Sequence, residues 1–363
     1  MRFIIFIFLL LSTALYANEK TPIKAIAIPL ADHYAGIIAY EKYKDKMQYA
    51  DYQILLLKGP ELVRAYFYSK DDADIAFNVL PMVIDMYAQK QYFKWVSLIH
   101  RDGNALTINE IMNSEVNLHN DKTKRKPDSK VADAFSTFKK LNNEAVECAI
   151  PSMLATHTTI LYKYLKDYNK TMSASKFDNP DVLLNIVKPP KAPIYLKKQT
   201  ARGEAAAFEQ SLPWPEIANN HHNGHIAWYS KDVMKTKHGH VECVIIAKDT
   251  VIKNKEKALK EVIFYIHKAG MDIENARAKG GKEFEKIIKM IQKHIPSHTK
   301  KAIMESLRTD IMAINYRHLN IDQNSKNSFK EIMDLAYEAG FIKSKIDIEK
   351  LADDRFSTSI TNE

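Results

Sequence analysis

Residues 143–165 read NEAVECAIPSMLATHTTILYKYL, and within this one stretch the sequence predicts a strand, a turn and a helix. Residues 146–150 are mostly apolar and predict a buried strand, which the following Pro-Ser pair ends. Apolar side chains then recur at helical spacing from Ile160 onward, and Thr156 stands where a helix N-cap is expected. This stretch therefore predicts one strand–helix unit of an α/β fold.

The start of this predicted helix is a candidate ligand site. The first N–H groups of a helix have no partner within the helix and carry partial positive charge, so anions and polar groups bind there. Thr156, His157 and Thr158 occupy this position. In a single strand–helix unit, helix capping alone would explain these residues. If these residues face the loops described below across a cleft, we predict that they contact a ligand.

Predicted strands and helices alternate along most of the chain. The predicted strands cover residues 23–28, 52–57, 73–77, 95–100, 146–150, 182–187, 205–208 and 241–248. The predicted helices cover residues 35–44, 61–68 and 82–89, followed near the C-terminus by 252–269, 283–294, 300–314 and 327–339. Such alternation predicts an α/β fold with mostly parallel sheets. A charged surface loop at residues 117–130 divides it, so we expect two lobes and a helical C-terminal return to the first lobe.

Polar residues follow the predicted strands, at the ends where α/β sheets bind ligands. They are Asp32, His33, Tyr34, Asn78, Gly103 and Asn104 in the first unit, and Glu209, Gln210 and Trp214 in the second. We therefore predict a ligand cleft between the lobes. The carboxylates of Asp32, Glu209 and Glu216 would repel a small inorganic anion. Either they point away from the site, or the ligand is neutral, zwitterionic or cationic.

The N-terminus predicts export. Residues 1–17 combine one arginine, the apolar run 3–11 and a small-residue end, which is typical of a cleavable signal peptide. The apolar run is shorter than the ~20 residues that a membrane span needs, so we expect a periplasmic protein. The formal net charge is +9, but the basic residues are spread along the chain. A nucleic acid partner would need a basic stripe, and we expect none.

Two further features leave alternatives open. Cys148 and Cys243 both follow a Val-Glu pair on predicted strands, and they form either a disulfide or two separate buried thiols. Five histidines lie close together in the sequence, namely His221, His222, His225, His238 and His240. Imidazole is a common metal ligand, but glycine and asparagine neighbours favour a polar loop with incidental histidines over a dedicated metal site.

Five stretches carry a family resemblance. They are residues 74–81 (DIAFNVLP), 100–107 (HRDGNALT), 150–159 (IPSMLATHTT), 208–216 (FEQSLPWPE) and 331–342 (EIMDLAYEAGFI). Through them the chain resembles the type II periplasmic solute-binding proteins of ABC transporters, in particular the nitrate/sulfonate/bicarbonate type, which is related to binders of thiamine-pyrimidine precursors. The resemblance covers nearly the whole mature chain.

The resemblance implies a domain arrangement and partners. After the signal peptide (1–17), lobe I would comprise residues 18–108 and 241–363, and lobe II residues 109–240, with crossings near 106–111 and 241–248. A small polar solute would be captured between the lobes and delivered to an ABC permease and its ATPase. We expect a monomer that is not an enzyme, with no cofactor and no metal. The alternative is a ligand-sensing subunit that acts with a sensor kinase.

The resemblance also implies ligand contacts. His157 and Thr158 would contact the ligand with help from Gly103 and Asn104, and Trp214 would line the opposite wall. The nearby carboxylates depart from an anion site. They disfavour nitrate and favour an organic ligand with an amine or amide and aromatic surface.

Overall fold

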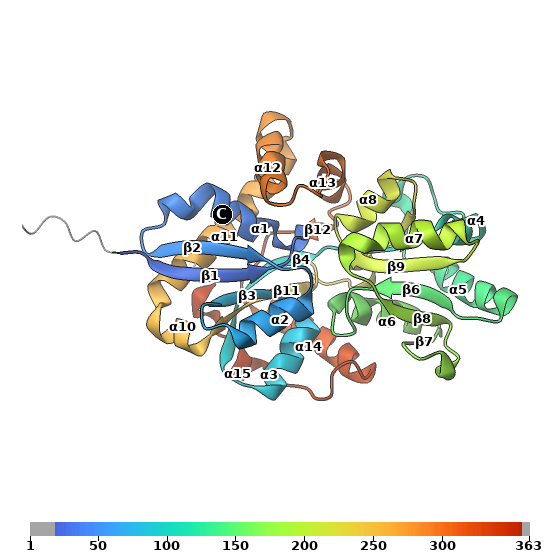
Figure 1. Ribbon diagram of the computed structural model, residues 1–363, viewed down its shortest axis with the longest axis horizontal. Coiled ribbons are helices and arrows are strands. Elements are labelled where there is room, and N and C mark those ends of the chain that lie inside the picture. Colours follow the sequence, from blue (N-terminus) through green and yellow to red (C-terminus); the bar gives the residue numbers. More distant parts are fainter. Residues whose placement is uncertain (1–18, 358–363) are drawn as a thin grey trace, which may run out of the picture.

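Two six-stranded sheets form the centres of two lobes that lie side by side (Figure 1). The computed structural model describes residues 19–357, so the signal peptide predicted at residues 1–17 lies outside the described residues. Within that range, no helix combines the length and the apolar character that a membrane span requires. The predicted fold class, α/β with two lobes, is confirmed.

The first sheet is built on β1, whose apolar residues from Ala25 to Ala27 are fully buried. In spatial order its strands are β12 (Ile314–Asn315), β4 (Phe93–Asp102), β11 (Val241–Lys248), β3 (Ile75–Val79), β1 (Thr21–Ala27) and β2 (Ala50–Leu56). β1 pairs in parallel with β2 and β3, as the strand–helix alternation predicts. β11 runs antiparallel to both of its neighbours, because the chain enters this sheet again from the other lobe.

The second sheet has the same plan. In spatial order its strands are β10 (His225–Tyr229), β5 (Asn104–Ile108), β9 (Ala206–Ser211), β6 (Val146–Ile150), β8 (Val182–Ile186) and β7 (Met172–Ser173). β6 is parallel to β8 and β9, whereas β5 is antiparallel to β9 and β10. β9 continues three residues beyond the predicted strand. Glu209 and Gln210 therefore lie within a central strand and not in the loop after it.

The chain crosses between the lobes twice, and the two crossings are hydrogen-bonded to each other. The first crossing is at Gly103, with φ +108, between β4 and β5. The position predicted at residues 106–111 is wrong, because β5 already pairs in the second sheet. On the return, residues 230–240 lead into β11. Here His240 N donates to Asp102 Oδ1 at 2.9 Å, and Asp102 N donates to His240 O at 3.1 Å.

The domain limits predicted from the sequence stay a prediction. The pairing of β5 with β9 places residues 104–108 with the second sheet. We therefore propose residue 103 as the first limit between lobes, in place of residue 108.

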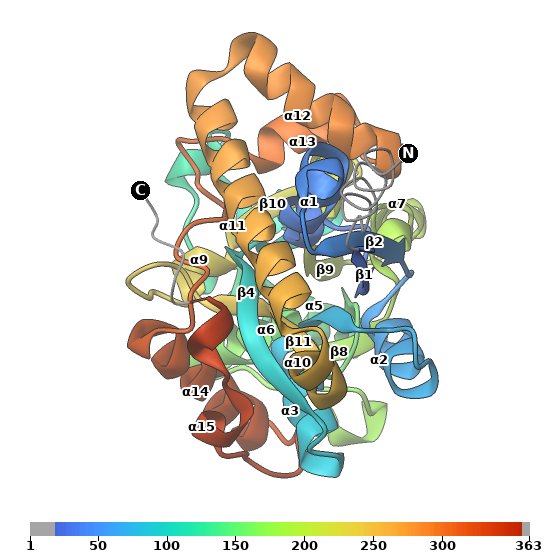
Figure 2. The ribbon, with the colours of Figure 1, turned by 90° about the vertical axis from the view of Figure 1, so that its left-hand side faces the viewer.

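Helices cover both sheets. The first lobe has α1 (Tyr34–Tyr43), α2 (Pro60–Ser69), α3 (Leu80–Gln89), α10 (Asp249–Asn254), α11 (Glu256–Lys279), α12 (Gly281–His294), α13 (Lys300–Ser306), α14 (Gln323–Glu338) and α15 (Ile348–Leu351). The second has α4 (Glu110–Val116), α5 (Ser129–Asn142), α6 (Thr156–Asp167), α7 (Ala192–Ala201), α8 (Trp214–Asn220) and α9 (Ser230–Val233). The long α11 packs along α1 and across the first sheet (Figure 2). The predicted helix at residues 300–314 is wrong beyond Ser306, because the chain turns there to form the edge strand β12.

The lobes are closed against each other. Ala31 N of the first lobe donates to Leu212 O of the second at 2.9 Å. Lys122 Nζ of the second lobe lies 2.7 Å from Glu305 Oε2 of the first. Helix α6 of the second lobe also packs against α14 of the first. Side chains at the facing ends of the two sheets are consequently removed from solvent.

Candidate functional site

A cluster of buried polar side chains lies where the two lobes meet. We call it the interlobe cluster, and it consists of Asp32, His100, Asp102, Asn104, His157, Glu209, Ser211, His240, Glu242 and Cys243. Each of these residues is 4% exposed or less. The first lobe supplies Asp32 from the turn after β1, and the second supplies His157 from the start of α6. So many titratable groups in one buried place point to a binding site.

Four side chains connect the lobes through short polar contacts. Ser211 Oγ donates a hydrogen bond to Asp32 Oδ2 at 2.7 Å. Ser211 Oγ also lies 2.6 Å from His157 Nε2. The other ring nitrogen of His157 lies 3.3 Å from Glu242 Oε1. His157 of the second lobe is therefore held between a serine of its own lobe and a carboxyl group of the first.

His240 adds a second imidazole between two carboxyl groups. Its Nε2 lies 3.5 Å from Asp102 Oδ1, and its Nδ1 lies 3.8 Å from Glu242 Oε2. His240 and Asp102 belong to the two crossing segments. The cluster therefore includes residues from the connection between the lobes as well as from the lobes themselves.

Asp32, His100 and Cys243 form a group of possible metal ligands. One ligand atom from each residue lies within 4.8 Å of the other two. His100 and Cys243 are register partners in the β4–β11 pairing, which brings their side chains together. Gly103 leaves space beside them, because a β-carbon there would lie 3.2 Å from Asp32 Oδ1 and 3.3 Å from His100 Cε1.

Burial raises the pKa of every carboxyl group in the cluster. The pKa of Asp32 is raised to about 8 and that of Asp102 to about 7. The pKa values of Glu209 and Glu242 are raised well above the usual range by burial and then by the nearby Asp32. Within the described residues, no lysine or arginine forms an ion pair with Asp32, Glu209 or Glu242. Burial therefore favours the neutral form of Asp32, Glu209 and Glu242, and a positive charge in the cluster would favour their ionised form.

Burial has the opposite effect on the imidazoles. It lowers the pKa of His157 to about 3 and that of His240 to about 4, and it lowers the pKa of His100 well below its usual value. Neutral imidazoles have a free lone pair and are good ligands for cations. The cluster thus offers neutral nitrogen donors beside carboxyl groups.

Several buried atoms of the cluster have no hydrogen-bond partner among the described residues. They include Asp32 Oδ1, both ring nitrogens of His100 and both carboxyl oxygens of Glu209. Buried polar groups are normally satisfied, because an unmade hydrogen bond costs roughly 1–3 kcal/mol. A ligand bound among these atoms would supply the missing partner.

Comparison with known proteins gives the family. The sequence matches the family described as NMT1-like over residues 16–288. The chain belongs to the NMT1-like family. A search of curated proteins finds no match.

Solved structures share the fold of this NMT1-like protein. The nitrate-binding protein NrtA from Synechocystis aligns with a TM-score of 0.73 and 16% identity, over 93% of this chain and 87% of that one. A zinc-bound ligand-binding component of an ABC-type import system from Staphylococcus aureus gives 0.71 and 13%, over 95% and 100%. The alkanesulfonate-binding protein SsuA from Xanthomonas axonopodis, bound to MOPS, gives 0.62 and 10%, over 92% and 98%. These structures confirm that the chain shares the fold of nitrate- and sulfonate-binding proteins.

Four of the predicted site residues are held by contacts within the fold. Tyr34 Oη lies 2.8 Å from His298 Nδ1, and Ile28 N donates to His33 Nδ1 at 2.8 Å. Asn78 Oδ1 accepts from Val79 N at 2.9 Å. Thr158 Oγ1 donates to Ser152 O at 2.7 Å, which fixes the turn before α6. The functional groups that these residues use in such contacts are occupied without a ligand.

Thr156 is not the N-cap of α6. The cap residue is Ala155, and Thr156 is the first residue of the helix. The Thr156 hydroxyl donates instead to Glu242 O, at 3.1 Å. Its oxygen therefore contributes to the contact between the lobes, which explains why a threonine stands at this position.

The other predicted site residues lie in the cluster or beside it. Asp32, Asn104, His157 and Glu209 are members of the cluster. Gln210 Nε2 donates to Val187 O at 3.1 Å, whereas the Gln210 Oε1 atom and the Trp214 Nε1–H group have no partner among the described residues. These atoms are available to a ligand.

The carboxylates near the predicted site do not face solvent. Glu209 and Glu216 are both fully buried. Glu216 has its own partners, since Lys122 Nζ lies 2.8 Å from Oε2 and Tyr229 Oη donates to Oε1 at 2.8 Å. The carboxyl group of Glu209 has no hydrogen-bond or ion-pair partner among the described residues, so the two carboxyl groups have different roles although they are seven positions apart in the sequence.

The five clustered histidines separate in the structure. His225 Nε2 lies 2.5 Å from Glu110 Oε2, and the ring of His238 stacks on His318 with 4.0 Å between centroids. His221 and His222 are exposed, and only His240 reaches the interlobe cluster. Cys148 and Cys243 are free buried thiols on different sheets, which resolves the open choice in favour of separate thiols.

Sequence reasoning missed six members of the cluster. They are His100, Asp102, Ser211, His240, Glu242 and Cys243. One signal was present, because Glu242 interrupts the otherwise apolar strand VECVIIAK with a charged residue. A carboxyl group inside a buried strand is costly unless it has a partner or a function. The contact of Cys243 with Asp32 depends on the order of strands in the sheet, which the sequence does not state.

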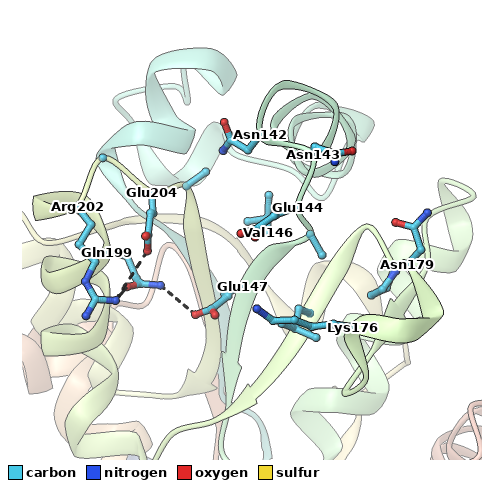
Figure 3. Close-up of a pocket in the computed structure, with 15 residues that line it drawn as sticks. Asn142, Asn143, Glu144, Val146, Glu147, Lys176, Asn179, Gln199, Arg202 and Glu204 are labelled. Carbon is cyan, nitrogen blue, oxygen red and sulfur yellow. Dashed lines mark hydrogen bonds and ion pairs between the residues drawn. The ribbon is translucent and has the colours of Figure 1, made fainter.

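A separate pocket of about 550 Å³ lies in the second lobe, at the end of the sheet where β6 starts (Figure 3). Four of its lining residues, Glu147, Gln199, Arg202 and Glu204, have side-chain partners. Glu147 Oε2 accepts from Tyr195 Oη at 3.0 Å and from Gln199 Nε2 at 2.9 Å. Arg202 lies 3.9 Å from Glu204 in an exposed ion pair. Because this pocket belongs to one lobe only, lobe closure does not complete it.

Proposed function

We propose that this protein is the substrate-binding component of an ABC importer, which captures a small solute between its lobes and delivers it to a membrane permease with an ATPase. The interlobe cluster carries the proposal, because polar groups from both lobes are buried there without partners. A ligand that contacts both lobes stabilises the closed form over the open one, and a permease can distinguish the two forms. The family and the folds of the nitrate- and sulfonate-binding proteins support this role.

The charge of the cluster bears on the kind of solute. Asp32, Glu209 and Glu242 are acidic, and no lysine or arginine among the described residues pairs with them. A positively charged solute would offset the cost of burying these groups in ionised form, whereas a nitrate or sulfonate ion would not. We propose a solute that carries positive charge or donates hydrogen bonds, in contact with Asp32, Asn104, His157, Glu209 and Trp214.

The proposal also covers the location and the oligomeric state of the protein. We propose that residues 1–17 direct export, that the mature protein acts as a periplasmic monomer, and that it binds its solute without changing it. Recovery of the bound solute in unchanged form from the purified protein would support a binding role. Turnover of the solute by the purified protein would contradict it.

The experiment that tests the proposal is a thermal-shift screen combined with small-angle scattering. The screen would include nitrate, bicarbonate, taurine, alkanesulfonates, pyrimidines, amines and divalent metal ions. A solute that binds the folded state raises the melting temperature, and closure reduces the radius of gyration. We expect a hit among the cationic or hydrogen-bond-donating compounds.

Two variants separate the cluster from other sites. His157→Ala and Glu209→Gln should weaken the hit, whereas Lys176→Gln in the separate pocket of Figure 3 should leave it unchanged. A hit that depends on Lys176 and not on His157 would move the binding site to that pocket. A hit that binds without any change in the radius of gyration would contradict capture by closure.

A further inference from the structure

We propose that the solute is a divalent transition-metal ion of the zinc class, bound by Asp32, His100 and Cys243 and covered by the second lobe. The inference rests on the proposed binding function and names the ligand class of the same site. It differs from the organic ligand that the sequence favoured, and it arises from three side chains that only the folded chain brings together.

The donor atoms have the chemistry of a zinc site. A carboxylate oxygen, an imidazole nitrogen and a thiolate sulfur are the three kinds of ligand that Zn²⁺ takes from proteins. The thiolate and the imidazole select against Mg²⁺ and Ca²⁺, which prefer oxygen ligands throughout. The charges also fit, because one carboxylate and one thiolate together balance a divalent cation.

The spacing of the donors is close to that of a metal site. Ligand atoms around a tetrahedral zinc ion lie roughly 3.5 Å apart, given metal–ligand distances of about 2.0–2.3 Å. The atoms of Asp32, His100 and Cys243 lie within 4.8 Å of one another. Shifts of about 1 Å would bring them to bonding distance around one ion.

An independent observation points to the same place. Asp32 Oδ1 and both ring nitrogens of His100 are buried and have no hydrogen-bond partner among the described residues. Gly103 keeps a side chain out of the space beside these atoms, since a β-carbon there would lie 3.2 Å from Asp32 Oδ1. A metal ion would satisfy the atoms that the protein leaves unsatisfied.

The second lobe supplies the link between metal binding and closure. Ser211 Oγ donates to Asp32 Oδ2 at 2.7 Å, which orients the carboxyl group from outside. Hydrogen bonds of this kind fix a ligand's direction and raise metal affinity. Glu209, also from β9, has no partner for either carboxyl oxygen within residues 19–357, and it raises the number of carboxyl groups near the ion. An open protein would lack both contributions, so the ion favours the closed form.

Isothermal titration of the purified protein with ZnCl2, after removal of metal with EDTA, tests the inference. We expect one Zn²⁺ per chain and no binding of Mg²⁺ or Ca²⁺. Cys243→Ser removes a direct ligand and should weaken Zn²⁺ binding by more than the roughly 10–100-fold that loss of an outer partner costs. Cys148→Ser is the matched control, because Cys148 is also a fully buried thiol that follows Val-Glu on a central strand, but lies in the other sheet. Equal effects of the two substitutions, or none, would overturn the proposal.

Substitution with Co²⁺ gives a readout that folding defects do not imitate. Cobalt bound to a thiolate shows a ligand-to-metal charge-transfer band in the near ultraviolet. The band should appear in the wild-type protein and in Cys148→Ser, and it should be absent in Cys243→Ser while circular dichroism confirms that this variant is folded. His100→Gln provides a second variant that should lose metal affinity and keep the fold. A band that persists in Cys243→Ser would exclude this thiolate as a ligand.

The two proposals fail in different ways. If Zn²⁺ does not bind but an organic solute binds and closes the lobes, the metal inference is wrong and the importer proposal stands. If Zn²⁺ binds through Cys243 without a decrease in the radius of gyration, the metal site stands and capture by closure is wrong.

Discussion

Ser211 of the second lobe donates a hydrogen bond to Asp32 of the first, with 2.7 Å between Ser211 Oγ and Asp32 Oδ2. Both side chains are fully buried, so water does not compete for this bond. It joins the central strand β9 to the turn after β1. The contact exists only while the lobes are closed, which makes it a direct measure of closure.

Removing this hydroxyl should weaken ligand binding. We expect Ser211→Ala to reduce the affinity for the solute about tenfold, since a hydrogen bond to a carboxyl group contributes roughly 1–2 kcal/mol. Titration calorimetry would measure the change, and scattering would show a larger radius of gyration with ligand present. Ser114→Ala on α4 is a suitable control, because its hydroxyl is exposed and bonds only within its own helix. Unchanged affinity in Ser211→Ala would show that the contact does not contribute to binding.

Lys122 connects two carboxylates of different burial, and this difference predicts unequal effects. Lys122→Met leaves the fully buried Glu216 without its cation, and we expect the free energy of unfolding to fall by about 3 kcal/mol. Glu305→Gln removes the more exposed partner and should cost less than about 1 kcal/mol. Urea unfolding would measure both values. Similar losses for both variants would mean that Glu216 finds another partner.

His267 predicts a loss of stability in acid. It is buried, its Nε2 lies 2.7 Å from Ser97 Oγ, and burial lowers its pKa to about 3. The imidazole therefore takes up a proton near pH 6.5 in the unfolded chain but only near pH 3 in the folded chain. The contribution of neutral His267 to the free energy of unfolding is complete above pH 6.5 and is lost between pH 6.5 and 3. From pH 7 to pH 5 the loss is about 2 kcal/mol. His267→Gln should flatten this part of the curve of unfolding free energy against pH, and an unchanged slope would contradict the assignment.

The thiols should be unreactive until the protein unfolds. Cys148 and Cys243 are both fully buried, and burial raises the pKa of each thiol well above its usual value. We expect a thiol-specific reagent such as DTNB to label neither cysteine in native buffer and two cysteines per chain in concentrated urea. Labelling of none in urea without reductant would demonstrate a disulfide and contradict the structure.

The fold followed from the sequence to a large extent because apolar periodicity is local. The strand at residues 146–150 has the bounds of β6, and the strand at residues 241–248 has those of β11. Errors arose where a neighbour in space decides the structure. Residues 314–315 join β4 as an edge strand, and no local pattern distinguishes them from the end of a helix.

The candidate site was predictable only in part. Asp32, Asn104, His157 and Glu209 stand out in the sequence because polar residues follow apolar strands. His100 and Cys243 lie 143 positions apart and meet through the β4–β11 register, which depends on the order of strands. The two Val-Glu-Cys motifs are identical in sequence but have different surroundings in the fold. Glu147 is hydrogen-bonded to Tyr195 and Gln199, whereas Glu242 faces two histidines.

The hydrogen bonds between Asp102 and His240 affect how the protein would move. They tie the outgoing and returning connections together, and Gly239 packs so closely on Asp102 that a β-carbon there would lie 2.2 Å from Asp102 Oδ2. We expect two linkers joined in this way to rotate as one pivot and to resist independent twisting of the lobes. Because His240 also contacts Glu242, the pivot and the binding residues share a side chain. We therefore expect the rate of solute release to depend on the pivot as well as on the contacts that hold the solute.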